Sequence, residues 1–245
     1  MHPSTARSDN KPDIHQNEEA PRTHCIRCGT CCIKGGPALH VEDLGLLKND
    51  AIKRSSLYTV RRGETVLNNV AGKPSVLSEE IIKIKGTGQS HTCIFYDKQQ
   101  KGCAIYENRP IECRLLKCWD TKDLEAVYEK NRLQRRHLIP SDTAVAQIIA
   151  THDQRCSYLA LETLIQKLEG PEAEDAVDKV LELLHFDHNL RPLVAQRLEL
   201  PIEEMDFFFG RPLTTTIKMF GLQVKQEGDT FLLSPIEQKI GELGN

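Results

Sequence analysis

The sequence lacks the features that identify several common classes of protein. Aromatic residues make up only 5% of its 245 residues, and no apolar run is long enough to span a bilayer. The N-terminus has no apolar signal-peptide core, so we expect a cytoplasmic chain without membrane association. A P-loop, a dinucleotide-binding glycine motif and a recognisable Ser, His and Asp arrangement are also missing. Nothing in these absences identifies a reaction.

The chain also lacks an excess of basic charge. Its formal net charge is -3, which argues against a general nucleic-acid-binding protein. The one basic concentration is Lys130–His137, which follows Glu125 and Glu129 and contains no aromatic residue. We interpret this run as the solvated face of a helix. A protein partner stays open, but no residue pattern identifies one.

Cysteine, in contrast, is abundant. Four of the nine cysteines fall within Cys25–Cys32. In the reducing cytoplasm such thiols indicate metal or redox chemistry rather than disulfides, and an odd count fits paired bridges poorly. Two residues between cysteines let both sulfurs face one ion. The predicted metal ligands are Cys25, Cys28, Cys31, Cys32, Cys93, Cys103, Cys113 and Cys118.

The metal itself is left open between an iron–sulfur cluster and Zn²⁺, because each takes four thiolates. Eight cysteines divide into two four-sulfur sites, or into one cluster with spare thiols. The adjacent side chains of Cys31 and Cys32 diverge, so which of them is a ligand also stays open. Thiols beyond one zinc site favour the iron–sulfur cluster, with a redox, carrier or enzymatic role. The alternative is a structural zinc module that supports a protein-interaction surface.

The residue patterns predict an α+β protein in three parts. Residues 1–22 are polar and read as a disordered tail. Residues 23–120 form the predicted cysteine-cluster domain, with short strands and a hairpin. Residues 121–245 form a mainly helical region that ends in a β-hairpin.

Strand patterns dominate the first part. The predicted strands are Leu57–Arg61, Thr65–Val70 and Glu80–Lys85, with a turn at Gly72–Pro74. A hairpin around residues 98–102 carries Cys93 and Cys103. If Asp97 faces Cys103 across this hairpin, the two cysteines share one face of the sheet, which is the register that a common site requires.

A helix is predicted to begin at Asn108–Pro110. It would place Cys113 in its first turn, where the positive end of the helix stabilises a thiolate. Cys118 lies five residues further on, so either the helix ends before it or its sulfur serves another purpose. Arg109 is interpreted as an anchor for the turn or a counter-charge for thiolates, and Tyr106 as a packing residue.

Helical patterns follow beyond residue 120. The predicted helices are Lys122–His137, one or two within Ala144–Leu168, Ala176–Leu184, Leu190–Leu198 and a short one in Pro201–Phe209. Strands at Leu222–Lys225 and Thr230–Leu233 close the chain. His152 and Cys156 lie four residues apart on one helical face, where they could ligate a metal. We favour a packing role for both.

The cysteine pattern resembles a known family. Cys25-x2-Cys28-Gly29-x-Cys31-Cys32, the later Cys93, and Cys103-x2-Tyr106-x2-Arg109-Pro110-x2-Cys113 are similar to the YkgJ-like family named for its CxxCxxCC signature. The resemblance covers about residues 22–120 and implies a zinc- or iron-chelating domain with these seven cysteines as ligands. One branch of the family resembles flagellin lysine methylases, so a methyltransferase activity is implied by analogy alone.

Overall fold

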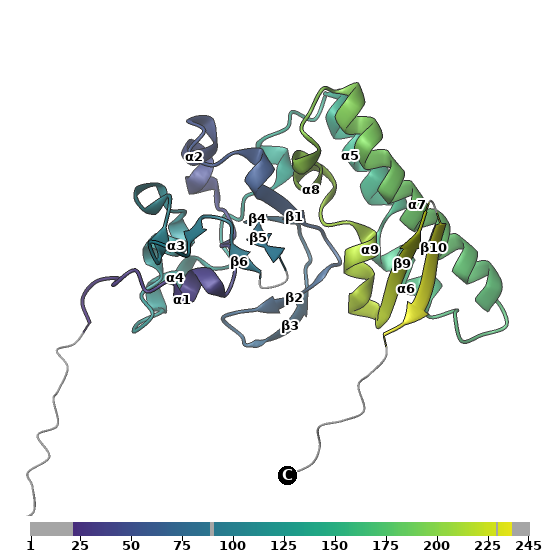
Figure 1. The fold of residues 1–245 in the computed structure, drawn as a ribbon, viewed down its shortest axis with the longest axis horizontal. Coiled ribbons are helices and arrows are strands. Elements are labelled where there is room, and N and C mark those ends of the chain that lie inside the picture. The colour runs from purple at the N-terminus through teal and green to yellow at the C-terminus, as the bar shows by residue number, and fades with distance from the viewer. Residues whose placement is uncertain (1–21, 89–90, 229, 237–245) are drawn as a thin grey trace, which may run out of the picture.

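The computed structural model describes residues 22–88, 91–228 and 230–236. The predicted disordered tail therefore lies, apart from its last residue, outside the described residues. The chain is an α+β protein, as predicted, with short antiparallel strand pairs in its first half and mostly helices after residue 140 (Figure 1). Within the described residues, none of the helices combines the length and the apolar character needed to cross a membrane.

The strands form antiparallel pairs. They are β1 (Leu57–Val60) with β4 (Ile81–Ile84), β2 (Thr65–Asn68) with β3 (Lys73–Val76), β5 (Gly86–Thr87) with β6 (Thr92–Cys93), β7 (Tyr96–Asp97) with β8 (Gly102–Cys103), and β9 (Leu222–Glu227) with β10 (Thr230–Pro235). The predicted strands and the terminal hairpin are present. The predicted turn at Gly72–Pro74 is wrong in part, because Lys73 and Pro74 belong to β3 and only Gly72 lies in the turn. Pro74 is tolerated there because it is exposed on a two-stranded edge.

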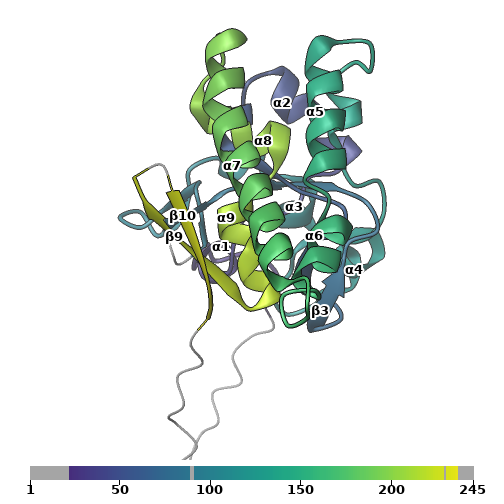
Figure 2. The same ribbon diagram turned by 90° about the vertical axis from the view of Figure 1, so that its right-hand side faces the viewer.

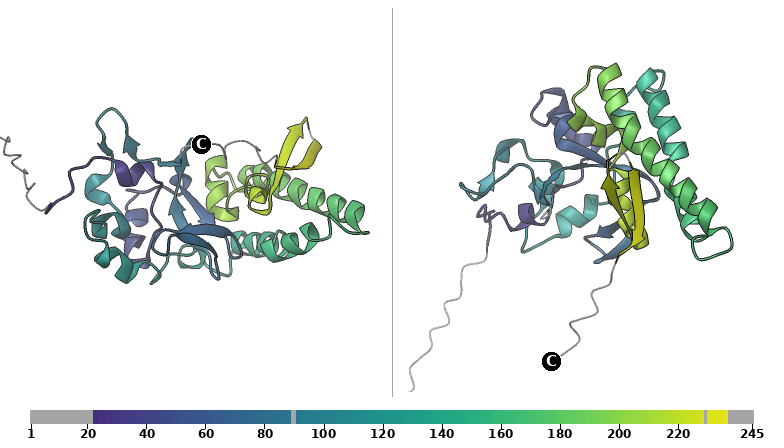
Figure 3. Two further views of the ribbon diagram at one scale, coloured as in Figure 1. Left: turned by 90° about the horizontal axis from the view of Figure 1, so that it is seen from below. Right: turned by 45° about the vertical axis from the view of Figure 1, so that its right-hand side comes forward.

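The helices of the first half are short, whereas the longer helices, together with further short ones, lie in the second half. They are α1 (Thr30–Ile33), α2 (Leu44–Lys48), α3 (Ile111–Leu115), α4 (Lys122–Val127), α5 (Ala144–Arg155), α6 (Tyr158–Ile165), α7 (Ala173–Arg197), α8 (Met205–Phe209) and α9 (Leu213–Thr216). Seen from below, the part that bears α1 and α3 and the part that bears α6 and α7 lie at opposite ends (Figure 3).

The larger hydrophobic core is built on the β1–β4 pair. Leu57 faces Ile84 and Thr59 faces Ile82 across the pair, and all four side chains are buried. From the far end of the sequence, α8 packs on β1 and adds Phe207–Phe209, which are at most 2% exposed. The Thr59 hydroxyl donates to the Phe207 carbonyl at 2.6 Å. Residues on both sides of position 120 thus share one core, whereas the three-part division stays a prediction.

A second core lies among α6, α7, α9 and the β9–β10 hairpin. Tyr158, Leu161 and Leu184 are buried there, and Phe231 of β10 stacks on His185 with ring centroids 4.5 Å apart. Figure 2 shows α5 and α6 side by side with α7, and β9–β10 beside α7. The predicted pair of helices at 176–184 and 190–198 is wrong, because α7 continues through both. Pro192 is tolerated inside it while Arg191 and Val194 are buried on the core side.

The predicted helix Lys122–His137 is also wrong beyond Val127. Leu133 is fully buried, and its backbone lies between Leu39 and Ile82, accepting a hydrogen bond from Ile82 N–H and donating one to the Leu39 carbonyl. These long-range backbone bonds override the local helical pattern. The basic run is therefore not a solvated helix face, since Arg135 is 5% exposed and pairs with Glu80.

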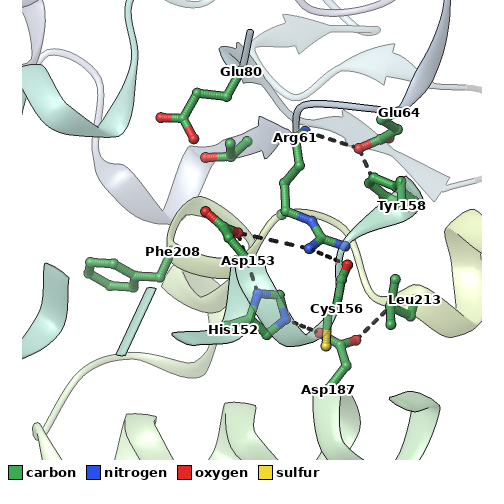
Figure 4. Close-up of polar contacts among 12 residues, drawn as sticks. Arg61, Glu64, Glu80, His152, Asp153, Cys156, Tyr158, Asp187, Phe208 and Leu213 are labelled. Carbon is green, nitrogen blue, oxygen red and sulfur yellow. Dashed lines mark hydrogen bonds and ion pairs between the residues drawn. The ribbon is translucent and has the colours of Figure 1, made fainter. Parts of the chain in front are cut away.

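A buried polar network joins β1 to the helical half (Figure 4). Arg61 lies over the Tyr158 ring, 4.5 Å from its centroid, and donates to the Cys156 carbonyl at 3.0 Å. His152 Nε2 lies 2.8 Å from Asp187 Oδ1. The second carboxylate oxygen of Asp187 accepts from Leu213 N–H at 2.8 Å. Charges that would be costly to bury alone are thus paired across α5, α7 and the segment before α9.

Asp187 makes a direct prediction about stability. Burial alone would raise its pKa, but the hydrogen bond with His152 and the charge of Arg191 outweigh burial and hold the pKa well below its ordinary value. Asp187→Asn should therefore lower the free energy of unfolding at pH 7 by about 3 kcal/mol, because the buried Arg191 loses its nearer counter-charge and keeps only Asp206, at 3.4 Å. Urea unfolding measures this loss.

The sign of the pH dependence follows from the lowered pKa. The stabilisation by Asp187 is fully present above its unfolded pKa of about 3.9 and is lost as the pH falls through the lower folded value. The difference between Asp187→Asn and the wild type should thus shrink only at acidic pH. Asp178→Asn, on the exposed side of the same helix, is the matched control and should change stability little. Equal losses for the two variants would contradict this assignment.

Candidate metal centre

The Cys25–Cys32 segment changes direction at Gly29. This glycine has φ +77°, a left-handed conformation that favours glycine, and α1 begins at the next residue. A Cβ atom at Gly29 would clash with the ring of Tyr96 in β7. The turn separates Cys25 and Cys28, which precede it, from Cys31 and Cys32, which lie on α1.

Helix α1 brings its two cysteines to β6, which ends in Cys93. Cys32 packs against the larger core, where Cys93 is buried. The hydrogen bond between the neighbouring thiols lowers the pKa of Cys31 to about 6, and the same bond together with burial raises the pKa of Cys32. The bond therefore favours a thiolate on Cys31 and a neutral thiol on Cys32.

Cys103 comes from β8, in a register that differs from the predicted one. Tyr96, not Asp97, faces Cys103, so the predicted register is wrong by one residue. Asp97 Oδ1 accepts N–H groups from Gln99 and Gln100 at 2.8 and 3.0 Å, which shortens the loop and pairs Asp97 with Gly102. Cys93 does not belong to this hairpin, because it pairs with Gly86 in the β5–β6 pair. The register of β7 and β8 therefore does not determine whether Cys93 and Cys103 lie on the same side.

Cys113 comes from α3, and hydrogen bonds to other segments fix the start of this helix. Asp43 Oδ1 accepts the N–H of Ile111 at 2.8 Å, and the buried Glu112 accepts from Ala38 N–H at 2.9 Å and from Arg132 Nη1 at 2.8 Å. Cys113 lies in the first turn, as predicted, and α3 ends at Leu115, before Cys118.

Five sulfurs interact electrostatically at this place. Burial raises the pKa of Cys113, and the charges of Cys93, Cys31 and Cys103 raise it further. The pKa of Cys32 is raised in the same way by Cys93 and Cys103, after the larger effects of its neighbour and of burial. We call these residues the inner cysteine group: Cys31, Cys32, Cys93, Cys103 and Cys113. The elements α1, β6 and α3, which carry four of these cysteines, lie in one part of the molecule (Figure 1).

The other three predicted ligands, Cys25, Cys28 and Cys118, are exposed and form the outer cysteine group. Each of their sulfurs has a hydrogen-bond partner outside the inner cysteine group. Arg27 N–H donates to Cys25 Sγ at 3.4 Å, Cys28 Sγ lies 3.3 Å from Thr30 Oγ1, and Arg22 Nη1 donates to Cys118 Sγ at 3.2 Å. Electrostatic effects link five of the eight predicted ligands, and ligation by any of the eight stays a prediction.

The donor set of the inner group fits a thiolate-bound metal. Five thiols exceed the four that zinc or an iron–sulfur cluster requires, and thiolates suit both. In the conformation described for residues 22–236, apart from the two gaps, no three His, Cys, Asp or Glu side chains are arranged to hold an ion. Ligation therefore requires a rearrangement of the inner side chains.

Positive charge lies beside the inner group. The charge of Arg109 lowers the pKa of Cys31, after the stronger effect of the Cys32 thiol, and opposes the effect of burial on Cys103. This matches the interpretation of Arg109 as a counter-charge. Tyr106 is more than a packing residue, since the guanidinium groups of both Arg109 and Arg27 lie over its ring. The contacts of Arg27 and Thr30 were not evident from the sequence, where both are ordinary polar residues between cysteines.

His152 and Cys156 take no part in this site. Both side chains are completely buried in the helical half, and His152 is bonded to Asp187. Burial, followed by the charge of Asp187, raises the pKa of Cys156 to about 12, so its thiol is neutral and inaccessible. The packing interpretation of these two residues is confirmed.

Gly29→Ala tests whether the turn positions α1. The added Cβ would clash with the Tyr96 ring, and alanine at position 29 would have to keep a left-handed φ. We therefore expect α1 to move away from β6 and the metal content to fall at least about fivefold. Gly72→Ala is the matched control, because Gly72 has φ +65° but open space around its Cβ position. Both variants carry a strain of about 1 kcal/mol. Elemental analysis of the purified variants measures the outcome, and equal metal content in the two would contradict it.

Comparisons with known proteins agree with the cysteine pattern. The chain is 33% identical over 105 residues to an uncharacterized protein of Methanocaldococcus jannaschii, an overlap of 43% of this chain and 48% of that protein. The chain thus spans about half the length of this relative. No solved structure matches the chain. The sequence model of the CxxCxxCC family, described as a "putative zinc- or iron-chelating domain", matches residues 24–137. These residues include the inner and outer cysteine groups, so the match supports the resemblance of this part of the chain to the CxxCxxCC family.

Proposed function

We propose that the inner cysteine group holds a metal centre ligated by thiolates, and that four of its five sulfurs are the ligands. The observation that carries this proposal is that α1 contacts β6, so that its cysteines join those of β6, β8 and α3, three elements that follow one another much later in the sequence. Several thiolates at one place would repel each other without a cation, and this repulsion adds to the effect of burial in raising the pKa values of Cys93, Cys103 and Cys113. A bound ion would neutralise the thiolates that ligate it, and the positive charge of Arg109 would assist.

The short elements support a structural contribution of the metal. Strands β5, β6, β7 and β8 have two residues each, and α1 has four. A two-stranded hairpin is marginally stable by itself in water. Ligation would tie these elements together, as it does in small zinc modules. A zinc module that supports a protein-interaction surface is therefore the second candidate function.

The spare thiols are the reason to prefer an iron–sulfur cluster over zinc. Either centre uses four sulfurs, and the thiols that remain among the five inner and three outer cysteines suit redox chemistry better than a purely structural zinc site. An iron–sulfur cluster supplies electron transfer when bound, and zinc supplies a structural tie or Lewis acidity. We propose the cluster, in a chain that works in the reducing cytoplasm, where free outer thiols persist.

Anaerobic purification of the full chain tests this proposal. We expect about four iron and four sulfide per chain for a four-iron cluster, with visible absorption that dithionite bleaches. Cys113→Ser should lose most of the metal because it removes an inner ligand, whereas Cys118→Ser, the matched change in the outer group, should retain it.

The outcomes separate the two levels of the proposal. About one zinc per chain without colour would replace the cluster by the zinc module and leave the inner ligands in place. A chain that holds no transition metal would contradict the metal centre itself. A Cys113→Ser variant that keeps its metal fully would contradict the role of Cys113 as a ligand and leave Cys31, Cys32, Cys93 and Cys103 as the four ligands.

Metal affinity should depend on pH in a defined direction. Burial raises the pKa of Cys93, Cys103 and Cys113, so these thiols are protonated near pH 7 and release protons when they bind metal. The zinc affinity of the metal-free chain should rise with pH, by about tenfold per pH unit for each proton displaced. Competition with a chromophoric chelator between pH 6 and 8 measures this slope. A slope near zero would contradict the inner ligands.

A further inference from the structure

Tyr106 lies between two arginine side chains. The Cζ atom of Arg27 is 3.7 Å from the centroid of the Tyr106 ring, and that of Arg109 is 3.6 Å from it. Two guanidinium groups at these distances would overlap on one face, so they occupy opposite faces of the ring. We call Arg27, Tyr106 and Arg109 the arginine clamp.

The clamp joins two segments that carry cysteines. Arg27 lies between Cys25 and Cys28, whereas Tyr106 follows Cys103 and Arg109 precedes Cys113. Arg109 is fixed on its own side, because its Nε donates to the Tyr106 carbonyl at 2.7 Å. The clamp is therefore a bridge from the loop that enters α1 to the segment that enters α3.

Arg27 is the side of the clamp that can open. Its backbone has φ +57°, which is strained for a residue with a Cβ atom. Its remaining ionic contact, to Glu107 at 4.0 Å, joins two side chains that are 58% and 87% exposed, so solvent screens it strongly. The ring of Tyr106 is thus the main contact that holds Arg27 in place, by a cation–π interaction that is weak at exposed sites.

We propose that the arginine clamp is a positioning device that holds the Cys25–Cys28 loop against the inner cysteine group and controls how fast metal leaves. When the clamp opens, the loop before α1 is free to move. The sulfurs of Cys28 and Cys31 then become accessible to a molecule that accepts the metal. The part that concerns metal rests on the function proposed above, whereas the part that concerns the loop does not.

Two readouts on the full chain test the clamp. In the reduced, metal-free protein, trypsin cleavage after Arg27 reports opening of the loop, because cleavage follows the population of the open form when opening is fast. In the metal-loaded protein, the rate of transfer to a chromophoric chelator reports metal release. Cleavage after Lys98 and Lys101, which lie in the exposed loop between β7 and β8, is the internal control.

Tyr106→Leu removes the ring and Tyr106→Phe keeps it, so these two variants form a matched pair. We expect Tyr106→Leu to raise both the cleavage after Arg27 and the rate of metal transfer about tenfold, equivalent to about 1.4 kcal/mol. Tyr106→Phe should stay within about twofold of the wild type, because the interaction uses the face of the ring. Cleavage at the control lysines should not change.

Arg27→Lys is the second variant. Because the side chain of residue 27 is exposed, this substitution should leave the fold intact. Lysine keeps the trypsin site and the charge but loses the flat stacking group, so cleavage after residue 27 should rise severalfold. Wild-type rates for both Tyr106→Leu and Arg27→Lys would overturn the proposal, as would equal increases in the Leu and Phe variants. A wild-type chain without metal would contradict the proposed function, while the trypsin readout would still decide on the clamp.

Discussion

Thiolates that are brought to one place repel each other, and the first half of this molecule depends on how that repulsion is relieved. Burial and mutual charge raise the pKa of Cys113, and the hydrogen bond between Cys31 and Cys32 lowers the pKa of Cys31 and raises that of Cys32. Protons on the thiols with raised pKa relieve the repulsion up to neutral pH. A metal ion would relieve it when it displaces these protons. The guanidinium of Arg109 assists in either state.

The surrounding fold holds the sulfurs at this place although the local elements are short. The buried Glu112, next to Cys113, binds Ala38 and Arg132 and so anchors α3 to the segment beside β4. The β1–β4 pair is completed by α8 from the end of the chain. The polar network of Arg61, His152 and Asp187 then joins this core to the long helices (Figure 4). The helical half thus supports the cysteine half through packing and buried charge.

The sequence predicted those features that depend on local patterns. The α+β class, the alternating strand at Ile81–Ile84, the position of Cys113 in the first turn of α3 and the terminal hairpin follow from periodicity and turn residues. The predictions were wrong where distant contacts outweigh local preference. Leu133 is drawn into backbone pairing with Leu39 and Ile82 instead of a helix, and α7 continues through Pro192 because its neighbours are buried.

The candidate site was predictable in its residues and less so in its geometry. The spacing of the cysteines indicates ligands, but the left-handed turn at Gly29, which separates the inner from the outer group, depends on the Tyr96 ring that packs against it. The hairpin register depends on two hydrogen bonds to Asp97, which shift Cys103 by one position. Neither effect follows from a spacing rule, since both depend on a single side chain and its neighbours.

X-ray absorption at the metal edge of the anaerobically purified chain tests the central claim most directly. A metal held by the inner cysteine group predicts a first shell made of sulfur alone, at about 2.3 Å for zinc. A shell of nitrogen or oxygen at about 2.0–2.1 Å would contradict it.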